Sequence, residues 1–320
     1  AQLVDSRDGS PIWAERFDRQ VEDLFDIQDE ITKEVVTALQ INLTDGEEAR
    51  AWSRGTNNIE AWQFCIQAKE LQDRLSATHL FESRPLAEKA IALDPNYAYA
   101  WAVLGFSYFR EARLDFSGDR HERLLKAEEL ANKAFRLDDT LAWAIALKAL
   151  TAAALGRHSE GEEVARRAVN LHPGNAGMRA FASLVFAFAG KFHEAIEQGE
   201  IALSLNPFPP VWYQMGIFRS HALLGNHHTA LELIGWVLKV EPDNIPARIF
   251  QSYCLESLGQ NEMAARSVAD LLRYVPHFRA EHVAGYLAMR DAALVGHVVN
   301  RLRQAGLPDD KILALPDRPS

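Results

Sequence analysis

The sequence predicts an all-α solenoid of about five to six helix pairs, because one short pattern returns at a nearly constant interval. An apolar run closed by proline recurs at Pro173, Pro207, Pro242 and Pro276, with intervals of 34, 35 and 34 residues. The segment Ala98–Tyr108 carries the fullest form of a second pattern, Trp-x2-Leu-Gly-x2-Tyr. A fixed period of this length indicates stacked helical units, each of which buries its apolar face against its neighbours.

Residues 1–45 precede the repeats and predict a β-hairpin followed by a helix. Ala1–Asp5 and Pro11–Phe17 have strand character, and Asp8-Gly9 supplies the turn between them. Asp26 is placed to cap a helix with an i, i+4 apolar stripe to Leu43. A hairpin alone is only marginally stable in water, and the chain has no initiator Met. We therefore expect the chain to be a piece of a longer protein, cut inside an α/β domain.

The remaining boundaries follow from composition and period. Residues 46–58 are polar and form the predicted linker, residues 59–306 form the array, and residues 307–320 form a tail. One repeat is ten residues longer than the others, with the extra residues around Arg113–Arg123. Pro85 is expected either to begin the second helix of the first unit or to kink it. The last unit, from about Arg279 to Gly306, is degenerate, as expected for the end of a solenoid.

Two positions within the repeats predict how the helices of a pair meet. A residue-Gly pair marks the turn between them, as in Leu155-Gly156 and Leu258-Gly259. A small residue follows six positions after the first member of each residue-Gly pair. These small residues are Gly161, Ala195, Ala230 and Ala264. We expect a close crossing of the two helices at this position, because a larger side chain would force them apart.

Composition excludes several classes of function. The net charge is −10, of which residues 1–56 contribute −7 from 6 Lys/Arg and 13 Asp/Glu, so a nucleic-acid partner is not expected. No apolar run is long enough to span a bilayer. Cys65 and Cys254 lie too far apart to indicate a disulfide framework, which favours a reducing, cytoplasmic location.

The 34-residue period with Trp-x2-Leu-Gly-x2-Tyr and a closing proline resembles tetratricopeptide (TPR) repeats. Ala1–Ile31, with Ile-Trp-Ala-Glu-Arg-Phe-Asp and Asp-Leu-Phe-Asp-Ile-Gln-Asp, resembles the end of the TolB-like domain that precedes TPR arrays in bacterial signalling proteins. This resemblance implies a parent protein similar to class III adenylate or guanylate cyclases. The alternatives are the regulatory tail of a winged-helix transcriptional activator and a stand-alone TPR scaffold.

No catalytic residue, cofactor or metal is expected in this chain, because no phosphate loop, nucleophile elbow or His-Glu-x2-His is present. His227-His228 is the densest histidine pair, and adjacent residues on a helix diverge by about 100°. The start of the second helix in a pair also carries His158 and His193, and we interpret all four histidines as solvated helix starts. The catalytic residues of a cyclase parent would lie outside the chain.

The predicted functional surface is the concave face of the first helix in each pair, where the resemblance to TPR proteins places the ligand groove. The groove residues are Tyr99, Phe106, Phe109, Arg110, Trp143, Leu150, Leu184, Phe188, Trp212, Met215, Arg219 and Tyr253. If exposed, this apolar strip predicts a protein or peptide partner, either an apolar helix or an extended segment, including one from the parent chain. It lacks the Lys and Asn residues with which chaperone-binding TPR proteins clamp carboxylates. If the superhelix curves tightly, the same residues pack against each other instead.

Overall fold

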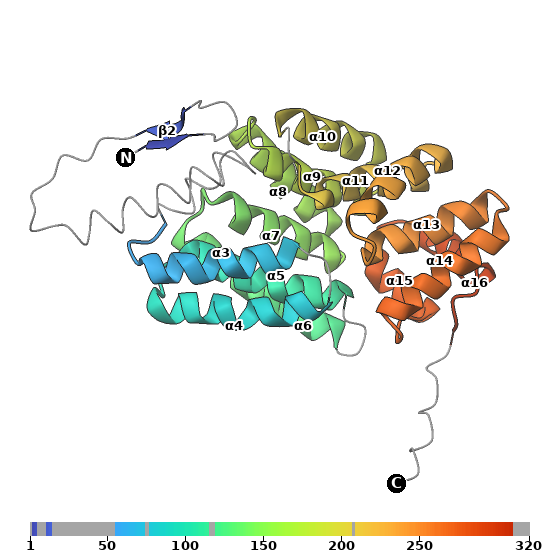
Figure 1. Cartoon of the computed structure of the whole chain (residues 1–320), viewed down its shortest axis with the longest axis horizontal. Coiled ribbons are helices and arrows are strands. Elements are labelled where there is room, and N and C mark those ends of the chain that lie inside the picture. Colours follow the sequence, from blue (N-terminus) through green and yellow to red (C-terminus); the bar gives the residue numbers. More distant parts are fainter. Residues whose placement is uncertain are drawn as a thin grey trace, which may run out of the picture.

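The computed structural model of the chain describes residues 2–4, 11–14, 55–73, 77–114, 119–206 and 209–309. Within these ranges the chain forms consecutive helix pairs that wind into an array (Figure 1). The helices are α3 (Ile59–Asp73), α4 (Ala77–Leu93), α5 (Ala98–Leu114), α6 (Arg120–Leu137), α7 (Ala142–Ala154), α8 (His158–Leu171), α9 (Ala176–Phe188), α10 (Phe192–Leu205), η2 (Val211–Tyr213), α11 (Gln214–Leu223), α12 (His227–Val240), α13 (Ile245–Ser257), α14 (Asn261–Tyr274), α15 (Ala280–Leu287) and α16 (Ala292–Gln304).

These described helices make seven pairs, one more than the upper number expected. The last pair, α15 and α16, lies within the degenerate unit that the sequence predicted from about Arg279 to Gly306. Pro85 lies inside α4 rather than at its first position. No helix of the described residues is both long and apolar enough to cross a bilayer.

Two short strands stand at the other end of the chain. β1 (Gln2–Val4) pairs antiparallel with β2 (Pro11–Ala14), and Leu3 faces Trp13. The predicted turn between them, the helix from Asp26 to Leu43 and most of the predicted linker lie outside the described residues. So do residues 310–320 of the predicted tail. The origin of the hairpin in a TolB-like domain stays a prediction.

Local sequence explains where the helices of the array begin and end. The Asn175 side chain accepts a hydrogen bond from the Met178 amide at 2.7 Å, and Asn244 caps α13 in the same way. In the four pairs from α7 to α14, a glycine with positive φ stands two residues after the end of the first helix. At Gly156, which follows α7, φ is +87°. Glycine adopts this left-handed conformation without the steric cost that a Cβ imposes. The residue-Gly pairs thus mark the turns that the sequence predicted.

The small residues mark close helix contacts. A Cβ added to Gly161 would lie 2.8 Å from the Ala149 carbonyl oxygen, which confirms the expected tight crossing of α7 and α8. A second close contact joins successive repeats, because a Cβ on Gly216 of α11 would lie 2.0 Å from Ser183 Oγ of α9. Real Cβ atoms do not approach heavy atoms so closely, so these positions fix the spacing of the helices.

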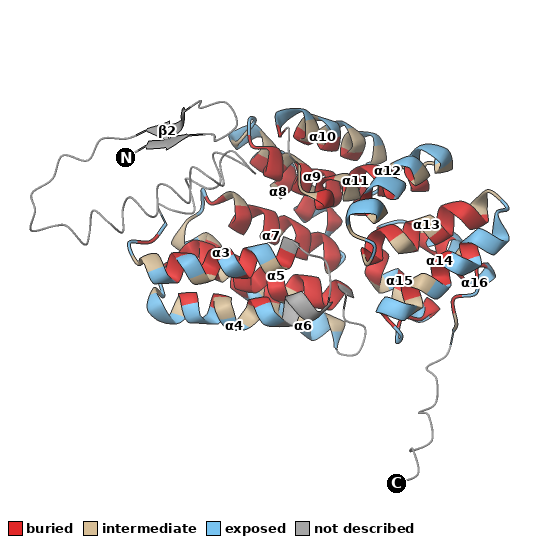
Figure 2. Cartoon of the chain, in the orientation of Figure 1, coloured by how far each residue is buried: buried red, intermediate tan, exposed pale blue. Residues whose placement is uncertain are grey.

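Burial divides the array into two layers (Figure 2). The first helices of the pairs form the inner layer, and α7 and α9 are buried on almost every side. The second helices form the outer layer, where α8 buries only one stripe. A helix that is apolar all round must be covered on all sides, whereas an amphipathic helix can face water. The core therefore lies along the inner layer.

The array curves so far that its last unit returns to its second. The Arg113 side chain at the end of α5 donates a hydrogen bond to the carbonyl oxygen of Tyr286 on α15. The Arg290 amide donates to the Phe188 carbonyl oxygen of α9 at 3.2 Å. α15 thus lies across the inner face and covers one end of the predicted groove. This contact closes the superhelix on itself.

Candidate functional site

The inner face is filled by a ladder of stacked aromatic rings rather than by solvent. Trp143 packs against Tyr99 and Phe106, with ring centroids 5.4 Å and 4.8 Å apart. Phe181 stacks on Phe106 at 5.3 Å and on Trp212 at 4.5 Å. Such offset and edge contacts stabilise aromatic pairs beyond the area they bury. The ladder joins α5, α7, α9 and η2.

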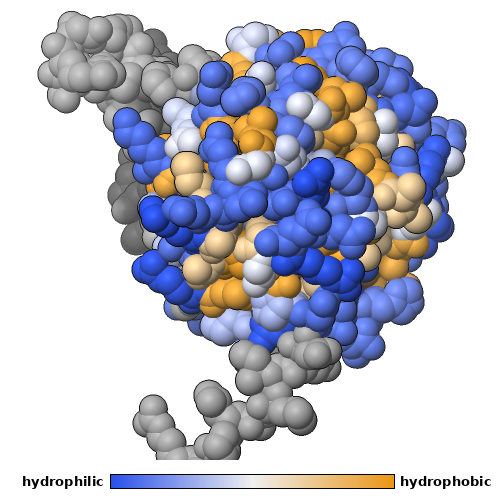
Figure 3. Space-filling view, turned by 90° about the vertical axis from the view of Figure 1, so that its right-hand side faces the viewer, coloured by the Kyte–Doolittle hydropathy of each residue, from blue (hydrophilic) through white to orange (hydrophobic). Residues whose placement is uncertain are grey.

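Of the two alternatives that the sequence left open, an exposed apolar strip or residues packed against each other, burial supports the packed one for this part of the chain. Eleven of the twelve predicted groove residues are buried, with Phe106 and Phe188 only 1 % and 2 % exposed. The twelfth, Met215, is half-buried. The physical reason is the tight curvature of the superhelix together with the cover that α15 supplies. On the face shown in Figure 3, hydrophobic residues form separate patches divided by hydrophilic ones.

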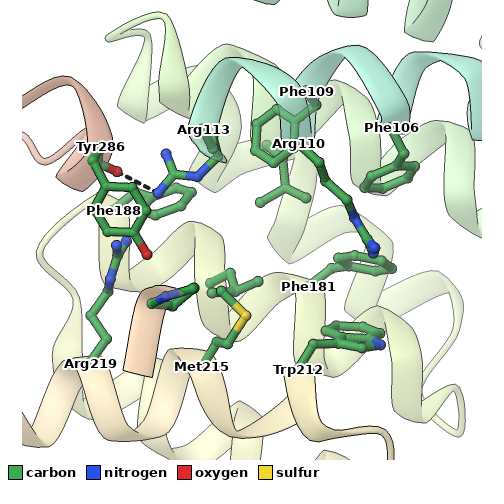
Figure 4. Close-up of a pocket in the computed structure, with 13 residues that line it drawn as sticks. Phe106, Phe109, Arg110, Arg113, Phe181, Phe188, Trp212, Met215, Arg219 and Tyr286 are labelled. Atoms are coloured by element: carbon green, nitrogen blue, oxygen red, sulfur yellow. Dashed lines mark hydrogen bonds between the residues drawn. The ribbon is translucent and has the colours of Figure 1, made fainter. Parts of the chain in front are cut away.

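A small cavity remains at the closed end of the groove, with a volume of about 60 Å³ (Figure 4). Most of the predicted groove residues line this cavity, while Tyr99, Trp143 and Tyr253 lie elsewhere. The predicted residues that line it are Phe106, Phe109, Arg110, Leu150, Leu184, Phe188, Trp212, Met215 and Arg219. Tyr253 instead packs beside His227 and His297.

The cavity brings together arginine side chains from two helices. Arg110 and Arg113 come from α5 and Arg219 from α11, and all three are more than nine-tenths buried. The Phe188 ring lies between two guanidinium groups, with centroid distances of 4.7 Å to Arg113 and 4.8 Å to Arg219. Tyr286 of α15 also contacts both, at 4.9 Å and 5.6 Å. These cation–π contacts partly replace the lost hydration of the charges.

The pKa values of Arg113 and Arg219 are lowered in this cavity. Burial, opposed by Tyr286 and assisted by the positive charge of Arg113, lowers the pKa of Arg219 to about 10. Burial also lowers the pKa of Arg113. Among the described residues, neither Arg113 nor Arg219 forms an ion pair. The nearby Glu111 is engaged elsewhere, because Arg84 donates to both of its carboxylate oxygens at 2.5 Å and 2.7 Å.

Sequence reasoning missed three residues that line the cavity, Arg113, Phe181 and Tyr286, whereas Pro246, which also lines it, stands at a groove position of the predicted helical register. Arg113 was assigned to the insertion, but the insertion lengthens α5 to 17 residues, against 13 in α7. This extension places Arg113 one turn beyond Arg110 and Phe109. The sequence does carry a signal for it, since Phe106, Phe109, Arg110 and Arg113 follow helical spacing. No pattern indicated that Tyr286 would return to α5.

No group of three or more His, Cys, Asp or Glu side chains with the arrangement of a metal site occurs among the described residues. The histidine positions at the start of the second helices also differ in part from the expectation. His158 is buried with 8 % exposure, whereas His228 is exposed.

Three features identify the type of repeat: consecutive helix pairs, a period of about 34 residues, and a glycine after the first helix of the regular pairs. The chain has the tetratricopeptide repeat (TPR) fold. Solved structures with a similar fold include that of the APC/C Cut9–Hcn1 hetero-tetramer, with a TM-score of 0.55, 13 % identity and coverage of 89 % of this chain and 54 % of that one. A monomeric mutant of IFIT1 with Gppp-AAAA has a TM-score of 0.55, 14 % identity and coverage of 91 % and 70 %. At this identity the likeness shows the fold alone.

The curated relatives of this TPR-fold chain are longer than the chain itself. "Putative adenylate cyclase 3" of Rhizobium meliloti (strain 1021) is 34 % identical over 138 residues, which is 43 % of this chain and 24 % of that protein. Superkiller protein 3 of Schizosaccharomyces pombe is 24 % identical over 208 residues, or 62 % of this chain and 14 % of that protein. The chain thus spans a quarter or less of each. No family model matches it.

Proposed function

We propose that this chain is a non-catalytic, regulatory protein-binding module, and that it belongs to a larger bacterial signalling protein of the class III nucleotide cyclase type. The observation that carries this proposal is the 34 % identity to the Rhizobium protein named as an adenylate cyclase. The aligned part covers 24 % of that relative. A repeat solenoid, whose stacked units offer an extended surface to a partner, suits a regulatory arm rather than a catalytic domain.

The proposed partner site remains the inner face, but in a form that differs from an open groove. A helix cannot enter while α15 lies across Phe188 and Arg113, because the cavity there holds only about 60 Å³. Binding of an apolar helix or extended segment therefore requires the last unit to move away. A module with two such arrangements responds to a partner only through the difference in affinity between them. Closure and partner binding would then compete, which gives the regulation a physical basis.

The first experiment is to read the coding sequence upstream of Ala1. A class III cyclase domain there supports the proposal, whereas a winged-helix domain supports the transcription-factor alternative. A coding sequence with neither domain supports the alternative of a stand-alone TPR scaffold protein.

The second experiment measures cyclic-nucleotide formation by the full-length protein and by an Arg219→Met variant, which weakens the contact with α15. The control is Arg266→Met on the outer helix α14, where the side chain is 80 % exposed. A change in turnover with Arg219→Met but not with the control supports a regulatory role. Equal turnover in all three proteins contradicts it.

A further inference from the structure

The arginine cavity has the chemistry of an anion site, and this inference stands on the cavity itself, whatever the parent protein is. Arg113 and Arg219 are 6 % and 2 % exposed, and neither pairs with a carboxylate among the described residues. A buried cation without a counter-charge is unfavourable, and a bound anion would remove that cost. Aromatic rings contact the faces of both guanidinium groups. The N–H donors lie at the edges of these groups, where the rings do not bind them.

One of these donors has no hydrogen-bond partner within the described part of the chain, although the Tyr286 side chain influences the pKa of both guanidinium groups. Arg113 Nη2 donates to the Tyr286 carbonyl oxygen, while Arg113 Nη1 is buried and has no hydrogen-bond partner among the described residues. Arg219 Nη1 reaches the Leu287 carbonyl oxygen only at 3.4 Å. In Figure 4 the two side chains approach Phe188 from opposite helices and end close to the same space. Buried donors in native proteins are almost always satisfied, so an unsatisfied one beside a cavity points to a missing acceptor.

A fourth arginine adds to the positive charge of this region. Burial and, to a smaller extent, repulsion by the positive charge of Arg113 lower the pKa of Arg120, at the start of α6, to about 10. Its side chain also lies against α15, because a Cβ on Gly285 would be 3.3 Å from Arg120 Cδ. The closed end of the array therefore concentrates cations from α5, α6 and α11, although the chain as a whole is acidic.

The rest of the lining defines the size and character of the anion. Apart from the arginines, the walls are mainly aromatic and aliphatic side chains such as Phe109, Leu150 and Met215. A volume of about 60 Å³ holds about four to six non-hydrogen atoms, by the space that one buried water needs. A phosphate has four oxygens to satisfy, whereas a carboxylate has two and leaves an apolar end to contact the walls.

We propose that this cavity binds a small aliphatic monocarboxylate, with the carboxylate on Arg113 and Arg219 and the alkyl end against the apolar wall. Because the ligand would connect α5 and α11 beneath α15, its binding would also stabilise the closed array. A ligand that binds the folded, closed form and not the unfolded chain raises the melting temperature, and the rise grows with the logarithm of the ligand concentration once this exceeds Kd.

The test is a thermal-unfolding series on the full chain with acetate, propionate, butyrate and hexanoate, each against sodium chloride at matched ionic strength. We expect propionate and butyrate to raise the melting temperature, hexanoate to raise it less, and the neutral propionamide to have no effect. Equal shifts with propionate and propionamide, or a larger shift with phosphate than with propionate, would overturn the assignment.

Two arginine variants and a control locate the effect. Arg113→Met and Arg219→Met should each reduce the propionate-induced shift at least several-fold, while the exposed Arg266→Met keeps it. Direct calorimetric titration of folded wild-type protein with propionate provides the second measurement, and it does not depend on how the variants fold. Absence of heat and of any shift, or an undiminished shift in both cavity variants, refutes the site.

Discussion

Replacing Phe188 with alanine distinguishes a packed inner face from an open groove. The ring is 2 % exposed, and it lies between the guanidinium groups of Arg113 and Arg219. Truncation of a buried Phe costs about 3–5 kcal/mol, from the lost transfer free energy and the cavity left behind. Two cation–π contacts, each up to about 2 kcal/mol when desolvated, are lost as well. We therefore expect a loss in the upper part of that range.

This loss is large against the total stability of a domain, about 5–15 kcal/mol. The assay is urea unfolding of wild type and Phe188→Ala, followed by helical circular dichroism and by tryptophan fluorescence. Agreement between the two probes checks that the array unfolds cooperatively. The control is Met263→Ala on the outer helix α14, where the side chain is 54 % exposed and a change within about 1 kcal/mol is expected. A Phe188→Ala protein within about 1 kcal/mol of wild type would refute the packed inner face.

Three further predictions concern stability, pH and cysteine chemistry. Gly216→Ala should destabilise the protein because its Cβ would collide with α9, whereas Gly235→Ala, with nothing within 4 Å, should stabilise it by up to about 1 kcal/mol, as measured by urea unfolding. His158→Gln should make the loss of stability between pH 7 and pH 5 shallower, because burial lowers the pKa of His158 below its ordinary 6.5 in the folded protein. Cys65 and Cys254 should resist a thiol reagent until the protein unfolds, since both are fully buried and burial raises the pKa of Cys254 to about 12.

The sign of the histidine effect follows from proton linkage. The positive charge of Arg290 adds to burial in disfavouring the protonated ring of His158. As the pH falls through 6.5, the unfolded chain therefore binds a proton before the folded one does, and stability declines. A pH profile for His158→Gln as steep as that of wild type would contradict this assignment. Equal effects of the two glycine variants, or rapid labelling of folded protein, would contradict the other two predictions.

The sequence predicted the array because its information is local and repeated. The glycine turn at Gly156 and the tight crossing at Gly161 each follow from residues within one repeat, and both are confirmed. The same local reasoning placed nine cavity-lining residues on the inner face through helical register.

Curvature could not be predicted in this way, because it accumulates over many repeats. Arg113 and Tyr286 are 173 positions apart, and no residue pattern couples them. Phe106 is buried by the aromatic ladder of neighbouring repeats, whereas Phe188 shares Arg113 and Arg219 with Tyr286 of the returning α15. The sequence revealed the insertion only as extra length. That the insertion lengthens α5 and brings Arg113 into the cavity was visible only in the structure.

The most direct test of the closed array is a double-mutant cycle between Arg113→Met and Tyr286→Leu, measured by urea unfolding. The two side chains belong to α5 and α15 and meet only if the last unit lies across the inner face, with 4.9 Å from the guanidinium to the ring centroid. The closed array predicts a coupling free energy of about 0.5–2 kcal/mol between the two substitutions. Additive effects, with no coupling beyond experimental error, would contradict the closure on which the cavity and its proposed ligand depend.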